Sequence, residues 1–159
     1  MEEIGESSSL GVLNGDEVIY VCRSSARHRL MAITLSVGTR LPAAYTSMGR
    51  VLLAQLPDDE LEDYLERVTL RAHTERSIVD KAQLRNCLEQ VRQLGYSIVD
   101  QELDPGLRSL AVPAHDANGK LLGAINVSTN AARVDFDILT HTFLPLLQEK
   151  LRLIRTHVS

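Results

Sequence analysis

Two Asn-Gly dipeptides constrain the fold of this chain more than any other feature. Asn14-Gly15 and Asn118-Gly119 each lie between two runs of strand length. Asn-Gly favours the tight turns in which both central residues take positive φ angles, and such turns join adjacent antiparallel strands. The sequence therefore predicts two β-hairpins and an antiparallel sheet. The expected strands span about 7–13, 17–22, 30–37, 96–103, 109–116 and 120–129.

Helical periodicity is found in four segments, at about 46–56, 57–68, 80–95 and 134–158. In the third, the apolar residues expected to face the core are Leu84, Cys87, Leu88, Val91 and Leu94. Asp80 and Gln83 resemble a capping box for that helix, and Gly95 closes it. Pro145 should bend the last helix. Three helices in succession, set between groups of strands, indicate an α+β fold.

Composition bounds the partners of the chain. Its 159 residues suffice for a single domain, and its net charge of −4 argues against nucleic-acid binding. Aromatic residues make up only 4%, so stacking on exposed bases is not expected. Cys22 and Cys87 resemble buried small hydrophobes, which fits a reducing, cytoplasmic setting. No apolar run approaches the ~18 residues needed to cross a membrane, so no membrane partner is expected.

The segment 38–56 turns from an extended stretch into a helix that opens near Thr46. A helix start presents unpaired backbone N–H groups and a partial positive charge, which suit a carboxylate or a phosphate. Ser47 adds a hydroxyl at this point, and Gly49 lets another group approach closely. The alternative interpretation is an ordinary capped helix whose apolar residues at 51–54 belong to the core.

Polar residues interrupt the apolar strand at 121–128. Asn126 and Ser128 are two positions apart and therefore share one face of this strand, and Ser109 on the neighbouring strand could lie on the same face. If these side chains are buried, they need hydrogen-bond partners, which a ligand in a pocket could supply. The alternative is that they face water from a half-exposed antiparallel sheet.

Patterns that would carry catalysis or bind a metal are missing. Ser47 lacks the leading glycine of a nucleophile elbow, and the five histidines show no spacing for a helix-borne metal pair. Neither a metal nor a cofactor is therefore expected. The basic run at 23–29 is either a solvated loop or part of an anion pocket. Arg50 and Arg108 are ambiguous, because each could neutralise a second carboxylate or pair with a surface glutamate.

Several separated motifs occur in an order that is specific to one family. They are Leu41-Pro42, Thr46-Ser47-Met48-Gly49-Arg50-Val51-Leu52-Leu53-Ala54, Gly95-Tyr96, Gly106-Leu107-Arg108-Ser109-Leu110-Ala111-Val112-Pro113, Gly119 and Ala124-Ile125-Asn126-Val127-Ser128. With them, nearly the whole chain, from about 5 to 158, resembles the C-terminal effector-binding domain of IclR-family bacterial transcription regulators. The sequences of these motifs are most similar to those of the PcaR/PcaU/PobR subgroup, which senses aromatic-acid or oxo-acid intermediates of the β-ketoadipate pathway.

The resemblance implies a GAF-like fold, in which helices flank a curved antiparallel sheet and a cavity between them binds small carboxylates. It implies that the backbone N–H groups of Ser47 and Met48 hold the carboxylate. The other effector-binding positions that it implies are polar Ser109, Asn126 and Ser128, and apolar Ile33, Leu41, Val99 and Leu107. Some family members carry an acidic residue in place of Val99. This pocket should therefore be less polar there, which suits an aromatic ring or a longer chain.

The resemblance also implies a domain plan and partners. Residues 1–6 would be the stub of an interdomain linker helix and 7–159 the effector-binding domain, with the family's N-terminal winged helix-turn-helix absent from this chain. DNA would be bound only through that missing domain, and the domains would form a homodimer or tetramer. Two other functions stay open. One is a ligand-free oligomerisation module, and the other is a small hydrolase that uses Ser47 with His115.

Overall fold

A computed structural model describes residues 7–24, 38–103 and 105–157, and it confirms the α+β fold. Its strands form one antiparallel sheet in the order β3-β2-β1-β6-β5-β4. The strands are β1 (Ser7–Asn14), β2 (Glu17–Ser24), β3 (Arg40–Pro42), β4 (Ser97–Asp100), β5 (Leu107–His115) and β6 (Leu121–Asn130). The strand expected at 30–37, and with it Ile33, lies outside the described residues.

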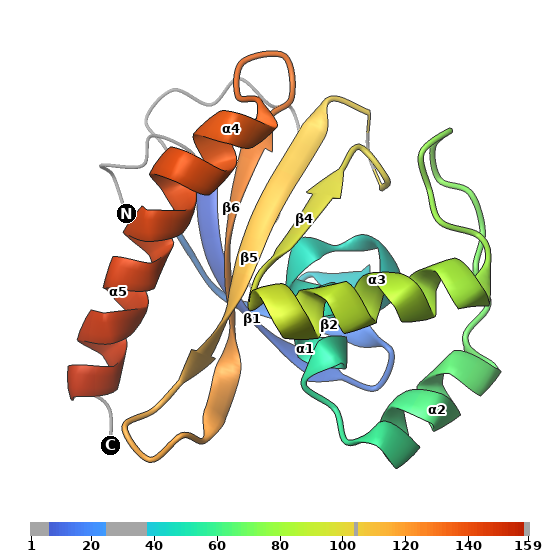
Figure 1. The fold of residues 1–159 in the computed structure, drawn as a ribbon, viewed down its shortest axis with the longest axis horizontal. Coiled ribbons are helices and arrows are strands. Elements are labelled where there is room, and N and C mark those ends of the chain that lie inside the picture. Colours follow the sequence, from blue (N-terminus) through green and yellow to red (C-terminus); the bar gives the residue numbers. More distant parts are fainter. Residues whose placement is uncertain (1–6, 25–37, 104, 158–159) are drawn as a thin grey trace.

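Both predicted hairpins are present, but their turns differ from the prediction, because Gly15 and Gly119 take positive φ angles while Asn14 and Asn118 do not. Asn14 pairs with Glu17 across the first turn, where Gly15 has a φ of 63°. In the second turn the Asp116 N–H donates to the carbonyl of Lys120. β1 pairs with β6, so the two hairpins lie side by side and together build the middle of the curled sheet (Figure 1).

Helices cover both faces of the sheet (Figure 1). One face is covered by the 3-10 turn η2 (Ala43–Tyr45), α1 (Ser47–Ala54), α2 (Asp58–Arg67) and α3 (Lys81–Leu94). The other is covered by α4 (Phe136–Ile138), the π-helical turn η3 (Leu139–Phe143) and α5 (Leu144–His157). Side chains alternate between the two faces along each strand, so Leu110 and Val112 pack with α5 while Ala111 packs with α1.

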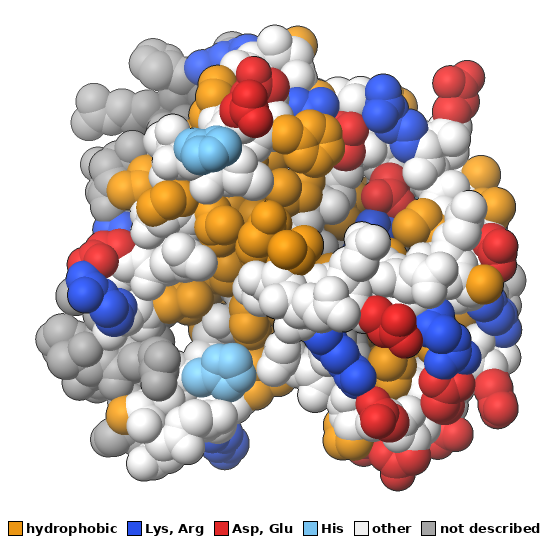
Figure 2. Space-filling model, viewed as in Figure 1, with side chains coloured by type: hydrophobic (Ala, Val, Ile, Leu, Met, Phe, Trp, Pro, Cys, Tyr) orange, Lys and Arg blue, Asp and Glu red, His pale blue; other side chains and the backbone are white. Residues whose placement is uncertain are grey.

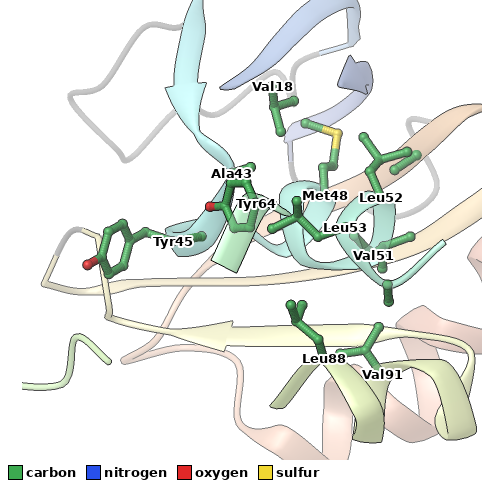
Figure 3. Close-up of a cluster of buried hydrophobic side chains, with 14 of the residues drawn as sticks. Val18, Ala43, Tyr45, Met48, Val51, Leu52, Leu53, Tyr64, Leu88 and Val91 are labelled. Atoms are coloured by element: carbon green, nitrogen blue, oxygen red, sulfur yellow. The ribbon is translucent and has the colours of Figure 1, made fainter. Parts of the chain in front are cut away.

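The core on the α1 side is centred on the buried face of α1. Met48 and Leu53 are fully buried, and Met48 points toward Val18 of β2 (Figure 3). The backbone of β1 approaches this point closely, because a Cβ on Gly11 would lie 2.9 Å from Val18 Cγ1 and 3.1 Å from Met48. A side chain at position 11 would therefore displace the methionine that anchors α1.

The third helix lies where it was predicted, but its N-cap lacks the bond from Gln83 that would make a capping box, and part of its predicted buried face is exposed. The Asp80 carboxylate accepts from the Ala82 N–H, and Gly95 closes the helix in the left-handed region at φ 81°. Leu84, Leu88 and Val91 are buried as expected, whereas Cys87 is only half-buried. The placement of Leu94 in the core was wrong, since this residue is 58% exposed. It is the last residue of α3, and the chain turns away through Gly95 before another element can cover it.

A π turn interrupts the last helix. The turn is closed by the Leu144 N–H donating to the carbonyl of Leu139, and Pro145 follows directly. Proline has no N–H to continue the α-helical ladder, and its ring crowds the carbonyl four residues earlier. The wider turn relieves both conflicts. Leu139, Phe143 and Leu147 are buried against the sheet on either side of it.

The second helix is amphipathic and strongly acidic. Leu61, Tyr64 and Leu65 are buried, and Asp58, Asp59 and Glu60 occupy the first turn, where the helix dipole favours negative charge. Figure 2 shows acidic side chains gathered over α2, which gives this surface the wrong sign for a phosphate backbone. None of the described helices has the length and apolar content that a bilayer crossing requires.

Candidate functional site

The start of α1 leaves two backbone N–H groups without a partner. Thr46 is the N-cap residue, since its Oγ1 accepts from the Gly49 N–H at 2.9 Å and its carbonyl accepts from the Arg50 N–H at 3.0 Å. Ser47 and Met48 lie between Thr46 and Gly49 in the chain, and within the described part of the chain their N–H groups have no acceptor. Two unpaired N–H groups at a helix start attract an anion.

The close approach that Gly49 permits is made by the protein itself. A Cβ on Gly49 would collide with the backbone of Ala43 in the preceding 3-10 turn. Gly49 therefore allows η2 to pack against the first turn of α1, and this packing fixes where the Ser47 and Met48 N–H groups point. Gly49 therefore affects the site by allowing this close packing and not by contacting a ligand itself.

Two neighbouring rows of side chains cross the sheet on the face that α1 covers. The first row consists of the cross-strand partners Ser128, Ser109 and Val99. The second row consists of Ser9, Asn126, Ala111 and Ser97. Cross-strand partners point to the same side of a sheet, and Ala111 packs in the α1 core, so both rows face α1.

Most polar members of these rows are buried. Ser9, Ser97, Ser109 and Asn126 each expose 7% or less, while Ser128 is half-buried. The alternative that Ser109 and Asn126 face water was therefore wrong. Ser109 and Asn126 were predicted from the sequence, whereas Ser9 and Ser97 were not. Only the strand pairing shows that Ser9 and Ser97 lie in the same row as Asn126.

Three buried side-chain atoms of the described chain have no hydrogen-bond partner: Ser47 Oγ, Ser97 Oγ and Asn126 Oδ1. One lies at the free helix start and two lie on the facing sheet. Asn126 Nδ2 makes only a long contact of 3.4 Å to Ser128 Oγ. An unpaired buried polar atom costs about 1–3 kcal/mol, and native structures contain few of them. Three of them between one helix and one sheet face mark a place where a polar ligand would complete the hydrogen bonding.

The apolar positions named from the sequence are more widely spread. Val99 is buried beside Ser109, and Leu107 is half-buried two positions earlier on the same face of β5. Leu41 lies on β3, opposite Val18, and packs against the α1 core from the other edge of the sheet. The structure thus brings Val99, Ser109 and Ser128 into one row, with Asn126 in the next row and Leu41 apart from both.

Arg50 is buried within α1 and paired with a carboxylate. Its Nε donates to the carbonyl of Ala44 at 2.9 Å, and its two terminal nitrogens donate to Glu102 at 2.9 and 2.5 Å. Burial alone would lower the pKa of Arg50, but the hydrogen bond and charge of Glu102 outweigh it and raise that pKa. The guanidinium therefore clamps α1 to the connection after β4, and its charge is already neutralised.

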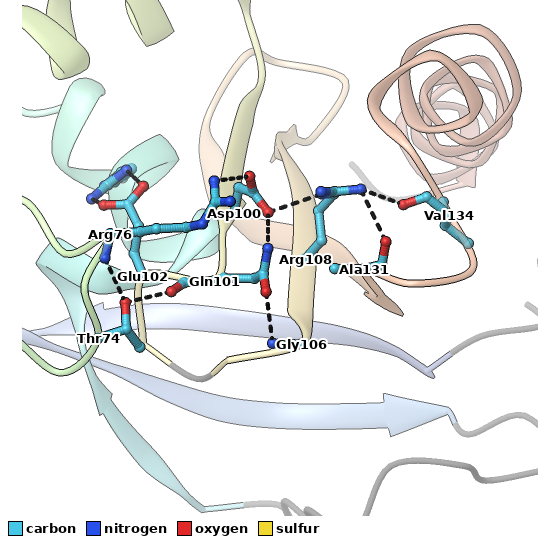
Figure 4. A network of polar contacts seen from close by, with 10 residues as sticks. Thr74, Arg76, Asp100, Gln101, Glu102, Gly106, Arg108, Ala131 and Val134 are labelled. Atoms are coloured by element: carbon cyan, nitrogen blue, oxygen red, sulfur yellow. Dashed lines mark hydrogen bonds and ion pairs between the residues drawn. The ribbon is translucent and has the colours of Figure 1, made fainter.

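Arg108 belongs to a second polar network (Figure 4). Its Nε donates to Asp100 at 3.0 Å, its Nη1 donates to the carbonyl of Val134 at 2.6 Å, and its guanidinium lies 4.7 Å from the ring centre of Phe136. These contacts tie β5 to the start of α4. Arg50 and Arg108 both pair with acidic residues of the protein, which favours structural roles for the two arginines.

A metal-ligating cluster and a base bonded to Ser47 are both missing from the described residues. No group of three metal-ligating side chains is found among them. Ser47 Oγ has no hydrogen-bond partner there, so no base is in place to activate it. His115 lies at the far end of β5, opposite Leu121 near the second hairpin turn.

A curled antiparallel sheet flanked by helices, with unpaired polar groups buried between one helix start and the sheet, defines a GAF-like ligand-sensing domain. Residues 1–155 match the family described as bacterial transcriptional regulator IclR C-terminal. The chain belongs to this family and is an effector-binding domain of the IclR type.

Its relatives are transcription regulators. The chain is 47% identical over 146 residues to the Pca regulon regulatory protein of Pseudomonas putida, covering 92% of this chain and 50% of that protein. A candidate transcriptional regulator from Rhodococcus sp. RHA1 matches with a TM-score of 0.92 and 43% identity, over 97% of this chain and 62% of that one. The chain spans about half the length of the curated relatives it matches.

A third relative was solved with a ligand. It is a double mutant of the inducer-binding domain of PobR from Acinetobacter, in complex with 3-hydroxybenzoic acid. The match has a TM-score of 0.88 and 30% identity, and it covers 96% of this chain and 89% of that chain.

Proposed function

We propose that this domain binds a small organic carboxylate, of the aromatic-acid or oxo-acid type, between the start of α1 and the sheet. One observation carries the proposal: the unpaired N–H groups of Ser47 and Met48 lie on the helix that packs against the sheet face carrying the unpaired atoms of Ser97 and Asn126. The N–H groups supply hydrogen bonds and positive potential for the carboxylate. The strands supply polar contacts for the rest of the ligand.

Each position has a role in this proposal. The carboxylate accepts from the N–H groups of Ser47 and Met48, and the ligand body lies over the two polar rows. The proposed polar contacts are Ser109, Asn126 and Ser128, and the proposed apolar walls beside these rows are Val99 and Leu107. Buried Val99 presents an apolar surface beside Ser109, which suits an aromatic ring.

The proposed regulatory mechanism is differential binding. The effector stabilises one arrangement of the subunits of a longer regulator, and the DNA affinity of that regulator shifts with this equilibrium. DNA would be contacted by a winged helix-turn-helix outside this chain, and the sensor domains would associate as dimers or tetramers in the cytoplasm. The likeness to the Pca regulon regulatory protein and to the PobR domain solved with 3-hydroxybenzoic acid supports regulation of aromatic catabolism. The domain itself would catalyse no reaction.

A ligand screen against a matched pair of variants tests the proposal. Native mass spectrometry and thermal shift with protocatechuate, 4-hydroxybenzoate and β-ketoadipate should reveal at least one acid that binds and raises the Tm. Ser47→Pro removes one N–H, while Ser47→Ala keeps it and removes only the hydroxyl. Thr46 has φ −119° and ψ 150°, which is compatible with a following proline, so the helix should still form.

We expect Ser47→Pro to weaken binding at least tenfold while the free energy of unfolding changes by less than about 1 kcal/mol. Ser47→Ala should weaken binding less. If no acid binds, or if Ser47→Pro binds as well as the unmodified chain, the helix start is only structural. A ligand-free oligomerisation module would then be the better description.

A further inference from the structure

The buried ion pair between Arg50 and Glu102 fixes a geometry more than it adds stability. The two side chains are 1% and 12% exposed. Removing two charges from water is costly, and well-packed apolar residues in place of such a pair often leave stability unchanged or raise it. An apolar pair would lack direction, however. The guanidinium donates two bonds to the Glu102 carboxylate and a third to the carbonyl of Ala44, and so orients both groups.

The groups that Arg50 orients flank the N–H groups of the proposed site. Ala44 belongs to η2, and those N–H groups lie between Ala44 and Arg50 in the chain. The hydrogen bond that closes η2 itself, from the Thr46 N–H to the carbonyl of Ala43, is long at 3.4 Å. Arg50 Nε holds the carbonyl of Ala44 more closely, at 2.9 Å. Pinning Ala44 to Arg50 limits how the chain between them can turn, and this sets where the N–H groups point.

A second set of contacts reaches η2 from the segment 71–77, which we call the strap. The Tyr45 hydroxyl accepts from the Arg71 N–H at 2.7 Å. The rings of Tyr45 and His73 meet edge to face, with their centres 4.7 Å apart. Tyr45 is buried and is the last residue of η2, so the strap holds this turn at the end nearest to α1.

The strap is also bonded to the connection after β4. Thr74 Oγ1 donates to the carbonyl of Gln101 at 2.5 Å (Figure 4), and Ser77 Oγ donates to the carbonyl of Glu102. Gln101 has a φ of 58°, and no other non-glycine residue that the structure describes has a positive φ. Such a conformation persists only where the surroundings fix it. The strap therefore helps to hold Glu102 where Arg50 can reach it.

These contacts run in a closed path, from η2 through the strap to Glu102, and from Glu102 through Arg50 back to η2. We infer that Arg50 and Glu102 are positioning residues of the proposed site, and that the strap, acting through them, holds the start of α1 in its ligand-binding geometry. The inference rests on the proposed function and gives these residues no contact with the ligand. Binding groups need such support, because a loosely held site loses affinity.

Isothermal titration of three variants tests whether the pair positions the site or only stabilises the fold. Glu102→Met leaves the buried guanidinium without its partner. Arg50→Met/Glu102→Met removes both charges and fills the space with flexible apolar side chains. Arg108→Met is the control, because it removes a guanidinium from the α5 side of β5 while Asp100 keeps Arg76 as a partner. The acid is whichever of protocatechuate, 4-hydroxybenzoate and β-ketoadipate binds the unmodified chain most tightly.

Glu102→Met should lower the Tm by at least about 10 °C, because an unpaired charge stays buried. The double variant should recover at least half of that loss, because this charge is gone. Its acid affinity should nevertheless stay at least tenfold below that of the unmodified chain, because Ala44 is no longer pinned. Arg108→Met should bind within about threefold of the unmodified chain. A purely structural pair would give a double variant in which Tm and affinity recover together.

Hydrogen exchange in the unmodified chain tests the same inference without any substitution. The His73 and Thr74 N–H groups donate to Ser77 Oγ at 2.9 and 3.0 Å. An acid that binds only while the path is closed makes opening of the strap rarer, so these N–H groups should exchange at least about threefold more slowly at saturating acid. The N–H groups of the second hairpin turn that donate to Asp116 Oδ1 are the control and should exchange at an unchanged rate.

Failure of this inference is distinguishable from failure of the proposed function. If an acid binds but the double variant regains both Tm and affinity, the pair is only structural and the carboxylate site stands. Strap N–H groups that exchange equally fast with and without acid also overturn the inference, and they decide it if the double variant does not recover its Tm. If none of the acids binds the unmodified chain, the proposed function falls and this inference falls with it.

Discussion

The two faces of the sheet are built from alternate residues of the same strands, yet their chemistry is opposite. The face toward α5 is mainly apolar, with Leu110, Val112, Ile125 and Val127 buried under that helix. Its buried hydroxyls, on Ser8 and Thr129, donate to backbone carbonyls and so have partners. One position away along each strand, the face toward α1 carries the two polar rows, in which buried atoms of Ser97 and Asn126 lack partners.

This difference separates a face whose burial needs no ligand from a face that we propose is completed by one. Apolar burial stabilises without any need for specific partners. Unpaired polar burial works against stability and is tolerated only where something else depends on it. Stability and binding should therefore be separable by substitutions on opposite faces of the same strands.

The largest effect is expected on the α5 face. Leu147→Ala removes a fully buried side chain and leaves a cavity, so the free energy of unfolding should fall by about 3 kcal/mol in urea titrations. Leu94→Ala makes the same chemical change at a position that is 58% exposed and should cost less than about 0.5 kcal/mol. The acid affinity of folded Leu147→Ala should be unchanged. A parallel loss of affinity would mean that the two faces are not independent.

A smaller effect on stability is expected at the start of α1. Thr46→Ala removes the side-chain acceptor for the Gly49 N–H and should cost about 1 kcal/mol. Because that cap also shapes the first turn, acid binding should weaken as well. Asp80→Ala, which uncaps α3, is the matched control, with a similar loss of stability but unchanged binding. Equal effects of the two variants on binding would contradict the role given to the α1 start.

The smallest effect on stability is expected in the polar row. Ser97→Ala removes a buried hydroxyl that has no partner, so the free energy of unfolding should change by less than about 0.5 kcal/mol or should rise slightly. Urea titration of the ligand-free domain measures this. A loss above about 1 kcal/mol would show that the Ser97 hydroxyl already has a partner, and the contrast between the faces would be weakened.

The elements that short-range signals specify were predictable from the sequence. Turn chemistry at Gly15 and Gly119, the cap at Thr46 and the helix end at Gly95 all depend on residues a few positions apart. The free N–H groups after Thr46 followed from the same local reasoning.

Features that depend on distant neighbours were not predictable. The burial of Arg50 depends on its ion pair with Glu102, which is 52 positions away in the sequence. No residue close to Arg50 in the sequence indicates this partner. Ser97 looks like any polar residue at a strand start until β4 is placed beside β5. The exposure of Leu94 likewise depends on where α3 ends relative to its neighbours, which helical periodicity does not encode.

The pairing of β1 with β6 has a kinetic consequence. The Ser8 hydroxyl reaches the backbone of Asn126 across 118 positions of sequence, and the two halves of the sheet meet only along this seam. Closing so long a loop is slow, since its entropy is lost before the contacts form. On the ribosome, the hairpin at 7–24 must wait for the strand at 121–130 to emerge before the row that contains Ser9 and Asn126 can form.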